Sequence, residues 1–188
     1  MAGGSKKGNP FELEVCRLLS RWWSGGARDD VFYRTGGSGG RATRRGRAGR
    51  GTANQCGDVG ASDPDGRPLT LLLALEIKRG YSRDTLHDLL DRPGGRASAY
   101  ELWMAQARES ARHAGAPGWL IIHRRDKRDA AALLSAAAAA LLLGAGADLT
   151  GPPHMVLNVG CAQAVLYRLS DLLGCVEPDH VRSAARRT

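Results

Sequence analysis

The chain has 188 residues, enough for one substantial hydrophobic core, and this length predicts one domain rather than two. Its formal charge of +8, from 27 Lys and Arg against 19 Asp and Glu, favours a polyanionic partner, with nucleic acid the first candidate. The four cysteines form no C-x-x-C pair, so neither a zinc ribbon nor a disulfide framework is indicated, and reduced thiols in a cytoplasm are expected.

No membrane or secretory role is expected. The first residues, MAGGSKKGNPF, carry charge without an apolar stretch after it, which argues against a secretory signal. The most apolar run, residues 130–143, would reach only about 21 Å as a helix, too short to span a bilayer.

A first helix is predicted from residue 9, with Asn9 as its cap, Pro10 in its first turn and Glu12 three residues after the cap. An apolar stripe at helical spacing should pack this helix on a sheet; it consists of Phe11, Val15, Leu18, Leu19 and Trp22. Glu12 and Glu14 lie on opposite flanks of the stripe, each about 80° from its centre, so periodicity leaves open which acid faces the site.

Residues 30–35 predict the first strand, followed by a Gly/Arg segment, residues 36–51, with seven Gly, five Arg and no acid. Such a segment buries little apolar area, so it is expected to be mobile alone and to order on DNA. A solvated basic loop is the alternative, and the lack of G-x-x-x-x-G-K-[ST] argues against a nucleotide-binding loop. Its arginines can neutralise phosphates: Arg41, Arg44, Arg45, Arg47 and Arg50.

Residues 55–62 predict a second strand that carries Asp58, and a turn at 63–66 leads into an apolar third strand at 69–78. Because side chains alternate along a strand, Glu76 and Lys78 project from one face. Two acids on adjacent strands can hold a hard cation such as Mg²⁺, with Mn²⁺ able to substitute, while a lysine orients water or offsets charge. Taken singly, these residues also fit a strand-edge acid and a cross-strand ion pair.

The rest of the chain predicts further helices and strands. A short helical pattern lies within residues 79–97, an amphipathic helix covers 99–115 with Gln106 and Ser110 beside its apolar face, and a buried strand covers 119–125. His123 on that strand is interpreted as a packed or hydrogen-bonded histidine. After it we expect a helix over 127–143 capped by Asp126, a strand over 154–160, a closing helix over 162–174 and a frayed basic tail over 176–188.

The spacing of Asp58 and Glu76-Ile77-Lys78 resembles the PD-(D/E)xK nuclease motif, with Val59 beside the first acid where many members have proline. The run KGNPFELEVCRLL is similar to the first helix of archaeal-type Holliday-junction resolvases and related phage nucleases. The resemblance covers about residues 6–125. It implies an α/β fold with a restriction-endonuclease-like αβββαβ core, in which helices flank a mixed central sheet. The sequence pattern after this core adds a C-terminal α-β-α extension over 126–175.

The resemblance also implies roles for individual residues. Glu12 is the matching helix acid, acting through water or a second ion; Ser38, in RTGGSGG, matches a loop serine near the scissile phosphate; and Gln106 matches a glutamine near the metal. Asp58 and Glu76 would bind Mg²⁺ with the Ile77 carbonyl as a further ligand. The expected DNA contacts are Lys7, Arg34, Ser38, Arg41, Arg44, Arg45, Arg47, Arg50 and Arg79.

The predicted function is metal-dependent DNA endonuclease, most specifically a structure-selective Holliday-junction resolvase. Two symmetric cuts in branched DNA require a C₂ homodimer, and the expected location is a prokaryotic or phage-infected cytoplasm. One alternative is a restriction-type, repair-type or nonspecific phage endonuclease. A second, from another class, is a non-catalytic DNA-binding or phage structural subunit that keeps the nuclease fold.

Overall fold

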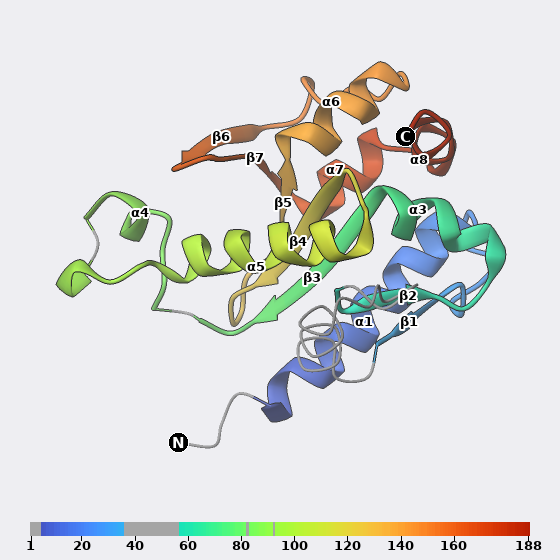
Figure 1. The fold of residues 1–188 in the computed structure, drawn as a ribbon. Helices are drawn as coiled ribbons and strands as arrows, with labels where there is room; N and C mark the ends of the chain where they lie inside the picture. The colour runs from blue at the N-terminus through green and yellow to red at the C-terminus, as the bar shows by residue number, and fades with distance from the viewer. Residues whose placement is uncertain (1–4, 36–56, 82, 92) are drawn as a thin grey trace.

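The computed structural model describes residues 5–35, 57–81, 83–91 and 93–188 (Figure 1). The elements, in chain order, are α1 (Ser5–Trp23), β1 (Phe32–Arg34), β2 (Val59–Ala61), the 3₁₀ turn η1 (Pro64–Gly66), α3 (Arg67–Leu72), β3 (Leu73–Arg79), α4 (Asp88–Asp91), the 3₁₀ turn η2 (Pro93–Gly95), α5 (Ala99–Ala114), β4 (Gly118–Arg124), β5 (Ala131–Ser135), α6 (Ala136–Gly144), β6 (His154–Val159), β7 (Ala162–Arg168), α7 (Leu169–Cys175) and α8 (Pro178–Ala185).

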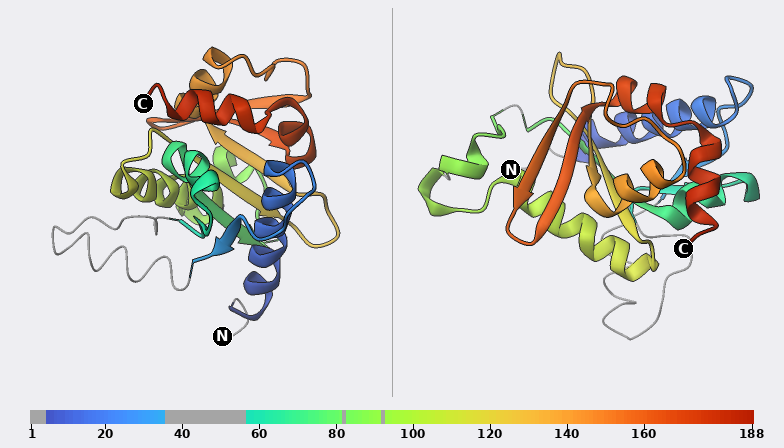
Figure 2. Two further views of the ribbon diagram at one scale, coloured as in Figure 1. Left: turned by 90° about the vertical axis from the view of Figure 1, so that its right-hand side faces the viewer. Right: turned by 90° about the horizontal axis from the view of Figure 1, so that it is seen from above.

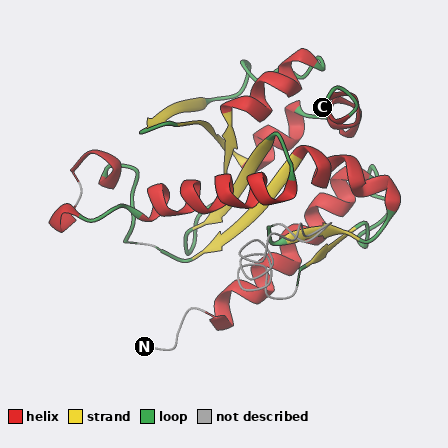
Figure 3. Ribbon diagram, viewed as in Figure 1, coloured by secondary structure: helices red, strands yellow, loops and turns green. Residues whose placement is uncertain are grey.

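A five-stranded mixed sheet with the order β3-β4-β5-β7-β6 forms the centre, and helices flank it (Figures 2 and 3). β3 and β4 are parallel, whereas the other pairs in this sheet are antiparallel. β1 and β2 form a separate antiparallel pair beside β3. The predicted restriction-endonuclease-like α/β fold is therefore confirmed. Within the described ranges, no helix is long and apolar enough to cross a bilayer.

Side-chain alternation along β3 divides the interior into two cores. Leu73, Leu75 and Ile77 join the core that contains α1, α3, α6, α7 and α8. Ala74 joins the opposite core, beneath α5. Because Glu76 shares the orientation of Ala74, the strand directs this carboxylate toward α5.

One helix and one strand begin at other residues than predicted. α1 begins at Ser5, so Asn9 is not its cap. Pro10 lies inside the helix, and because proline has no backbone N–H, the helix lacks one hydrogen-bond donor there. The long strand predicted over 69–78 begins only at Leu73. The residues before it form α3, in which Leu69 and Leu72 are buried while Leu71 is exposed, a helical spacing hidden in the leucine run.

The predicted C-terminal α-β-α order also needs correction, because this part contains three strands. Residues 131–135 and 162–168, predicted as parts of helices, are β5 and β7. β5 pairs with both β4 and β7, and this sheet environment overrides the helical propensity of its alanines and leucines. Ser135 then caps α6 by accepting a hydrogen bond from the Ala138 N–H.

The last residues are not a frayed tail. α8 contacts α3 and α6 and buries Val181 and Ala184 in the larger core. The Arg182 guanidinium lies 4.5 Å from the centre of the Trp23 ring and pairs with Asp65. The carboxyl-terminal helix therefore closes the core around α1 and α3.

We predict that Val181→Asp lowers the free energy of unfolding by at least about 3 kcal/mol, because it places an unpaired charge in this core. Val181 is 1% exposed. Chemical denaturation measures the loss, and Arg186→Gln, at the exposed C-cap of the same helix, is the control. A stability equal to that of the parent would mean that α8 is not part of the folded core.

Candidate active site

The candidate site is built around Glu76, a residue that is 1% exposed and whose carboxylate accepts three side-chain hydrogen bonds. Lys78 Nζ donates to Glu76 Oε2 at 3.0 Å, and Gln106 Nε2 donates to the same oxygen at 2.7 Å. Ser110 Oγ donates to Oε1 at 2.8 Å. Lys78 Nζ also donates to Gln106 Oε1 at 3.0 Å, so lysine, glutamine and glutamate form a closed ring.

Helix α5 positions two of these donors. Ser98 and Glu101 form a capping box at its start, and Gly115 ends it with φ +67°. The predicted apolar face is buried against the sheet, which places Gln106 and Ser110, four residues apart, on the flank above β3.

Asp58 is anchored to the backbone of β3. It lies just before β2, and its N–H donates to the Leu75 carbonyl at 2.6 Å. The Asp58 side chain continues this pairing: its Oδ2 accepts a hydrogen bond from the Ile77 N–H at 2.7 Å, where a neighbouring strand would supply a backbone carbonyl. The two acids predicted on adjacent strands are therefore brought together, although Asp58 precedes its strand rather than lying within it.

Thr35 and Gly57 fix the approach of Asp58 to β3. The Thr35 N–H donates to the Asp58 carbonyl at 3.0 Å, and Thr35 Oγ1 donates to the Gly57 carbonyl at 2.7 Å. Gly57 has φ +95°, and a Cβ there would lie 2.4 Å from the Leu75 carbonyl oxygen. Only glycine permits this close contact of the two backbones.

Burial and the nearby Asp58 charge raise the pKa of Glu76, and the Lys78 and Ser110 contacts only partly oppose this rise. Two carboxylates in a region of limited solvent access thus repel each other across the site. This repulsion is what a bound cation would offset.

Glu12, on α1, is linked to this region through Arg34 and Cys16. Arg34 Nε donates to Glu12 Oε2, so two residues predicted for separate roles are partners. The charges of Glu12 and Asp58 both act on the Cys16 thiol, whose pKa is raised to about 12 chiefly by burial. Cys16 therefore lies within electrostatic reach of both acids.

Glu14 points elsewhere. Its two carboxylate oxygens accept from both Nη atoms of Arg124, and this contact lowers the Glu14 pKa. The structure thus separates the two acids that periodicity left equivalent, with Glu12 in an ion pair with Arg34 of β1 and Glu14 in an ion pair at the end of β4.

The donor set fits a hard, strongly hydrated cation. Among the described residues, no three His, Cys, Asp or Glu side chains gather in a group suited to a metal. Asp58 and Glu76 could supply two carboxylates, leaving other positions to water and phosphate oxygens, which is how Mg²⁺ is commonly held. Tetrahedral Zn²⁺ sites instead use three or four protein ligands.

The remaining predicted contacts are only partly placed. Arg79 Nε lies 3.5 Å from Asp126 Oδ1, and the Arg79 guanidinium lies over the Phe11 ring. Lys7 belongs to α1, but its side chain is outside the described part. Also outside it are Ser38, Arg41, Arg44, Arg45, Arg47 and Arg50. His123 is buried, and its Nε2 lies 3.2 Å from the Gly80 carbonyl, as a packed histidine should.

Sequence reasoning did not assign Ser110 or Thr35 to the site. For Ser110 a signal existed, because it follows Gln106 by four residues and must share its helix flank. For Thr35 there was none, because its contacts join residues 22 or more positions apart.

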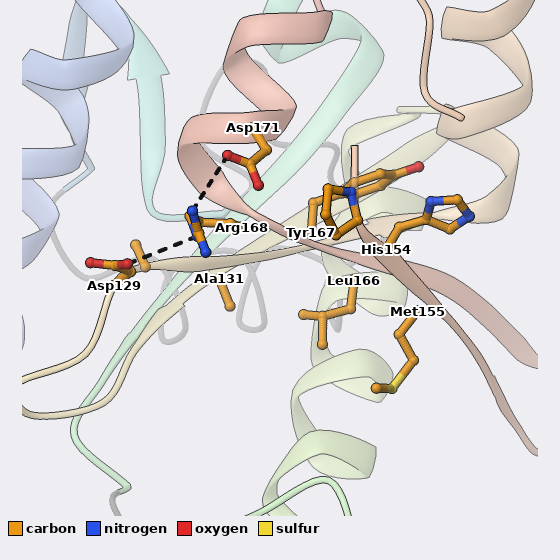
Figure 4. A pocket seen from close by; sticks show the side chains of 10 residues that line it. Asp129, Ala131, His154, Met155, Leu166, Tyr167, Arg168 and Asp171 are labelled. Atoms are coloured by element: carbon orange, nitrogen blue, oxygen red, sulfur yellow. Dashed lines mark ion pairs between the residues drawn. The ribbon is translucent and has the colours of Figure 1, made fainter. Parts of the chain in front are cut away.

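A pocket of about 390 Å³ opens between β5, β6, β7 and α7, away from this site (Figure 4). Arg168 in it is paired with Asp129 at 3.8 Å and Asp171 at 3.9 Å. None of the predicted site residues lines the pocket. The candidate reactive residues Asp58, Glu76 and Lys78 therefore lie at β3, outside this pocket.

The fold and the arrangement of Asp58 beside Glu76 and Lys78 of β3 define the class of PD-(D/E)xK nucleases, enzymes that generally use divalent metals. A family model described as "Phage putative PDDEXK endonuclease" matches residues 3–144, and the chain belongs to that family. Searches of curated proteins and of solved structures gave no match.

We predict that Glu76→Gln stabilises the metal-free protein at pH 8. In the parent, ionised Glu76 is penalised in the folded state but not in the unfolded chain, so stability is lost as pH rises above its ordinary pKa of 4.5. The new amide oxygen can still accept from Lys78 and Gln106, and its NH₂ can donate to the Ser110 hydroxyl.

Thermal unfolding in chelator between pH 4 and pH 8 measures this effect. The stability gap between variant and parent should widen as pH rises. Glu109→Gln, which removes an exposed acid paired with Arg112 on α5, is the matched control. A variant less stable than the parent at pH 8 would contradict the raised Glu76 pKa.

Proposed function

We propose that the chain is a Mg²⁺-dependent endodeoxyribonuclease whose reaction centre consists of Asp58, Glu76 and Lys78. The observation that carries the proposal is the convergence of a buried acid, a second acid and an ammonium at one end of β3. A nuclease of this family needs such a centre to bind a cation beside a phosphodiester.

Asp58 and Glu76 would hold the ion, with the Ile77 carbonyl as a further ligand and Mn²⁺ as an alternative metal. When bound, Mg²⁺ would supply a Lewis acid that offsets the negative charge gathering on the phosphate. Asp58 keeps its orientation through the Ile77 N–H, while Gln106 and Ser110 orient Glu76.

Lys78 would contact the reacting group. An ammonium has three N–H donors, and two of them are directed to Glu76 and Gln106. The third is available to orient the attacking water or to stabilise charge on the phosphate. Gln106 and Ser110 are positioning residues in this scheme.

Glu12 would contribute a third acid through a water molecule or a second ion. Its partner Arg34 uses Nε for Glu12, and a guanidinium carries four further N–H donors on its Nη atoms. Arg34 could therefore hold Glu12 and a DNA phosphate at once. The other DNA contacts proposed from the sequence are Lys7, Ser38, Arg41, Arg44, Arg45, Arg47, Arg50 and Arg79.

We further propose branched DNA as the substrate and a two-fold homodimer as the active form, acting in a prokaryotic or phage-infected cytoplasm. Strand β6 supports the dimer. No strand lies beyond it among the described residues, it has no charge or proline, and its pairing with β7 is unbroken by a bulge. Met155 and Val156 on this edge are 50% and 60% exposed.

Antiparallel pairing of β6 with its copy would join two sheets without opposing charges. The two β3 strands would then be nine strand spacings apart, or about 43 Å at 4.8 Å each. Two reaction centres at that separation suit paired cuts in different arms of one branched molecule.

We predict that Glu76→Gln and Asp58→Asn each reduce Mg²⁺-dependent cleavage by at least about 10²–10³-fold, because each removes a charge that holds the cation. DNA affinity in chelator should change little, since it depends on the basic surface. The assay compares four-way junction, flap and plain duplex, each with Mg²⁺ and with chelator, and Glu109→Gln serves as control.

The parent should cut the junction faster than duplex and in symmetric pairs. Val156→Lys, which charges the β6 edge, should sediment as a monomer and lose paired cutting. Equal rates on junction and duplex would instead favour the restriction-type, repair-type or nonspecific nuclease. Binding without cleavage of any substrate would favour the non-catalytic subunit.

A further inference from the structure

The turn between β4 and β5 carries a cluster of cations that have no role in the proposed reaction centre. Residues 124–129 read RRDKRD. Within the described part, no ion pair is formed by Arg125, Lys127 or Arg128, and the last two are exposed. We call these three residues the hairpin cations.

The backbone of this turn is strained at a charged residue. The Arg128 N–H donates to the Arg125 carbonyl at 3.2 Å, which closes a four-residue turn. Lys127, its third residue, has φ +59°, a conformation that favours Gly or Asn. A lysine at such a position is a reason to look for a function of its ammonium group.

The turn is also fixed relative to the candidate site. The Gly80 N–H donates to the Arg124 carbonyl at 3.1 Å, and Arg79 pairs with Asp126 inside the turn. Arg124 itself lies 4.2 Å from the centre of the Phe11 ring. The hairpin cations therefore project from a base held by β3 and α1 together.

The register of β3 and β4 gives the distance between the hairpin cations and Lys78. Lys78 is paired with His123 across the parallel β3–β4 ladder, and Arg125 lies two residues further along. With about 4.8 Å between strands and 3.3 Å per residue, the two backbone positions are about 8 Å apart. Each DNA strand carries a phosphate about every 3.4 Å along the helix axis, so this reach covers phosphates close to the cleaved one.

We propose that Arg125, Lys127 and Arg128 bind the phosphodiester backbone of duplex DNA next to the cleaved position, as a second contact surface beside Lys78. This inference rests on the proposed function for its ligand. The three cations neutralise phosphates without reading bases, so they add affinity and alignment but no sequence preference.

The test measures binding of a 30-base-pair duplex in chelator at several salt concentrations, so no cleavage is needed. The triple variant Arg125→Gln/Lys127→Gln/Arg128→Gln should bind at least about tenfold more weakly at low salt and reduce the slope of log K against log [salt] by about 2 to 3. The charge-matched control is Arg17→Gln/Arg67→Gln/Arg186→Gln, three exposed arginines on α1, on α3 and at the C-cap of α8. It should keep most of the parent's slope.

Lys127→Asn separates binding from folding. Asparagine tolerates positive φ, so the melting temperature should not fall, while the salt slope should drop by about 1. Equal slopes for the triple variant and the parent, or equal losses in the control, would overturn the proposal. If the triple variant shows the predicted reduction in slope but the parent cuts no DNA, the proposed catalysis fails while the hairpin contact stands.

Discussion

The burial of the Glu76 carboxylate is the constraint on which the site depends. Three donors surround this group, yet burial and the neighbouring Asp58 still raise its pKa. Compared with a neutral residue of the same shape, the ionised Glu76 side chain lowers the stability of the metal-free fold, because its charge is buried beside a second acid. Its chemistry instead suits a cation, which would turn the repulsion between two acids into a shared attraction.

Strand β3 connects this charge to the rest of the fold. Leu73, Leu75 and Ile77 are held in the core with α1, while Glu76 and Lys78 face α5. On the edge of β3 that does not pair with β4, the Leu75 carbonyl and the Ile77 N–H form hydrogen bonds with Asp58. Backbone contacts therefore set the separation of the two acids, and this rigidity is what a metal centre with few protein ligands requires.

The sequence predicted the elements that local patterns determine, and missed those that neighbours determine. Strand alternation placed Glu76 and Lys78 on one face, and the family resemblance, not periodicity, placed Gln106 near them. The alanine-rich residues 131–135 were predicted as helix because their pairing with β4 and β7 has no local signal. The Glu12–Arg34 and Thr35–Gly57 contacts each join residues 22 positions apart, a relation that periodicity does not contain.

The most direct test of the central claim is calorimetric titration of Mn²⁺ into the parent, Asp58→Asn, Glu76→Gln and the control Glu109→Gln at pH 6 and pH 8. If both acids hold one cation, the parent and the control should bind Mn²⁺ more tightly at pH 8, because protons then compete less for Glu76. Asp58→Asn and Glu76→Gln should each bind at least about tenfold more weakly. Unchanged binding by Glu76→Gln would contradict the account.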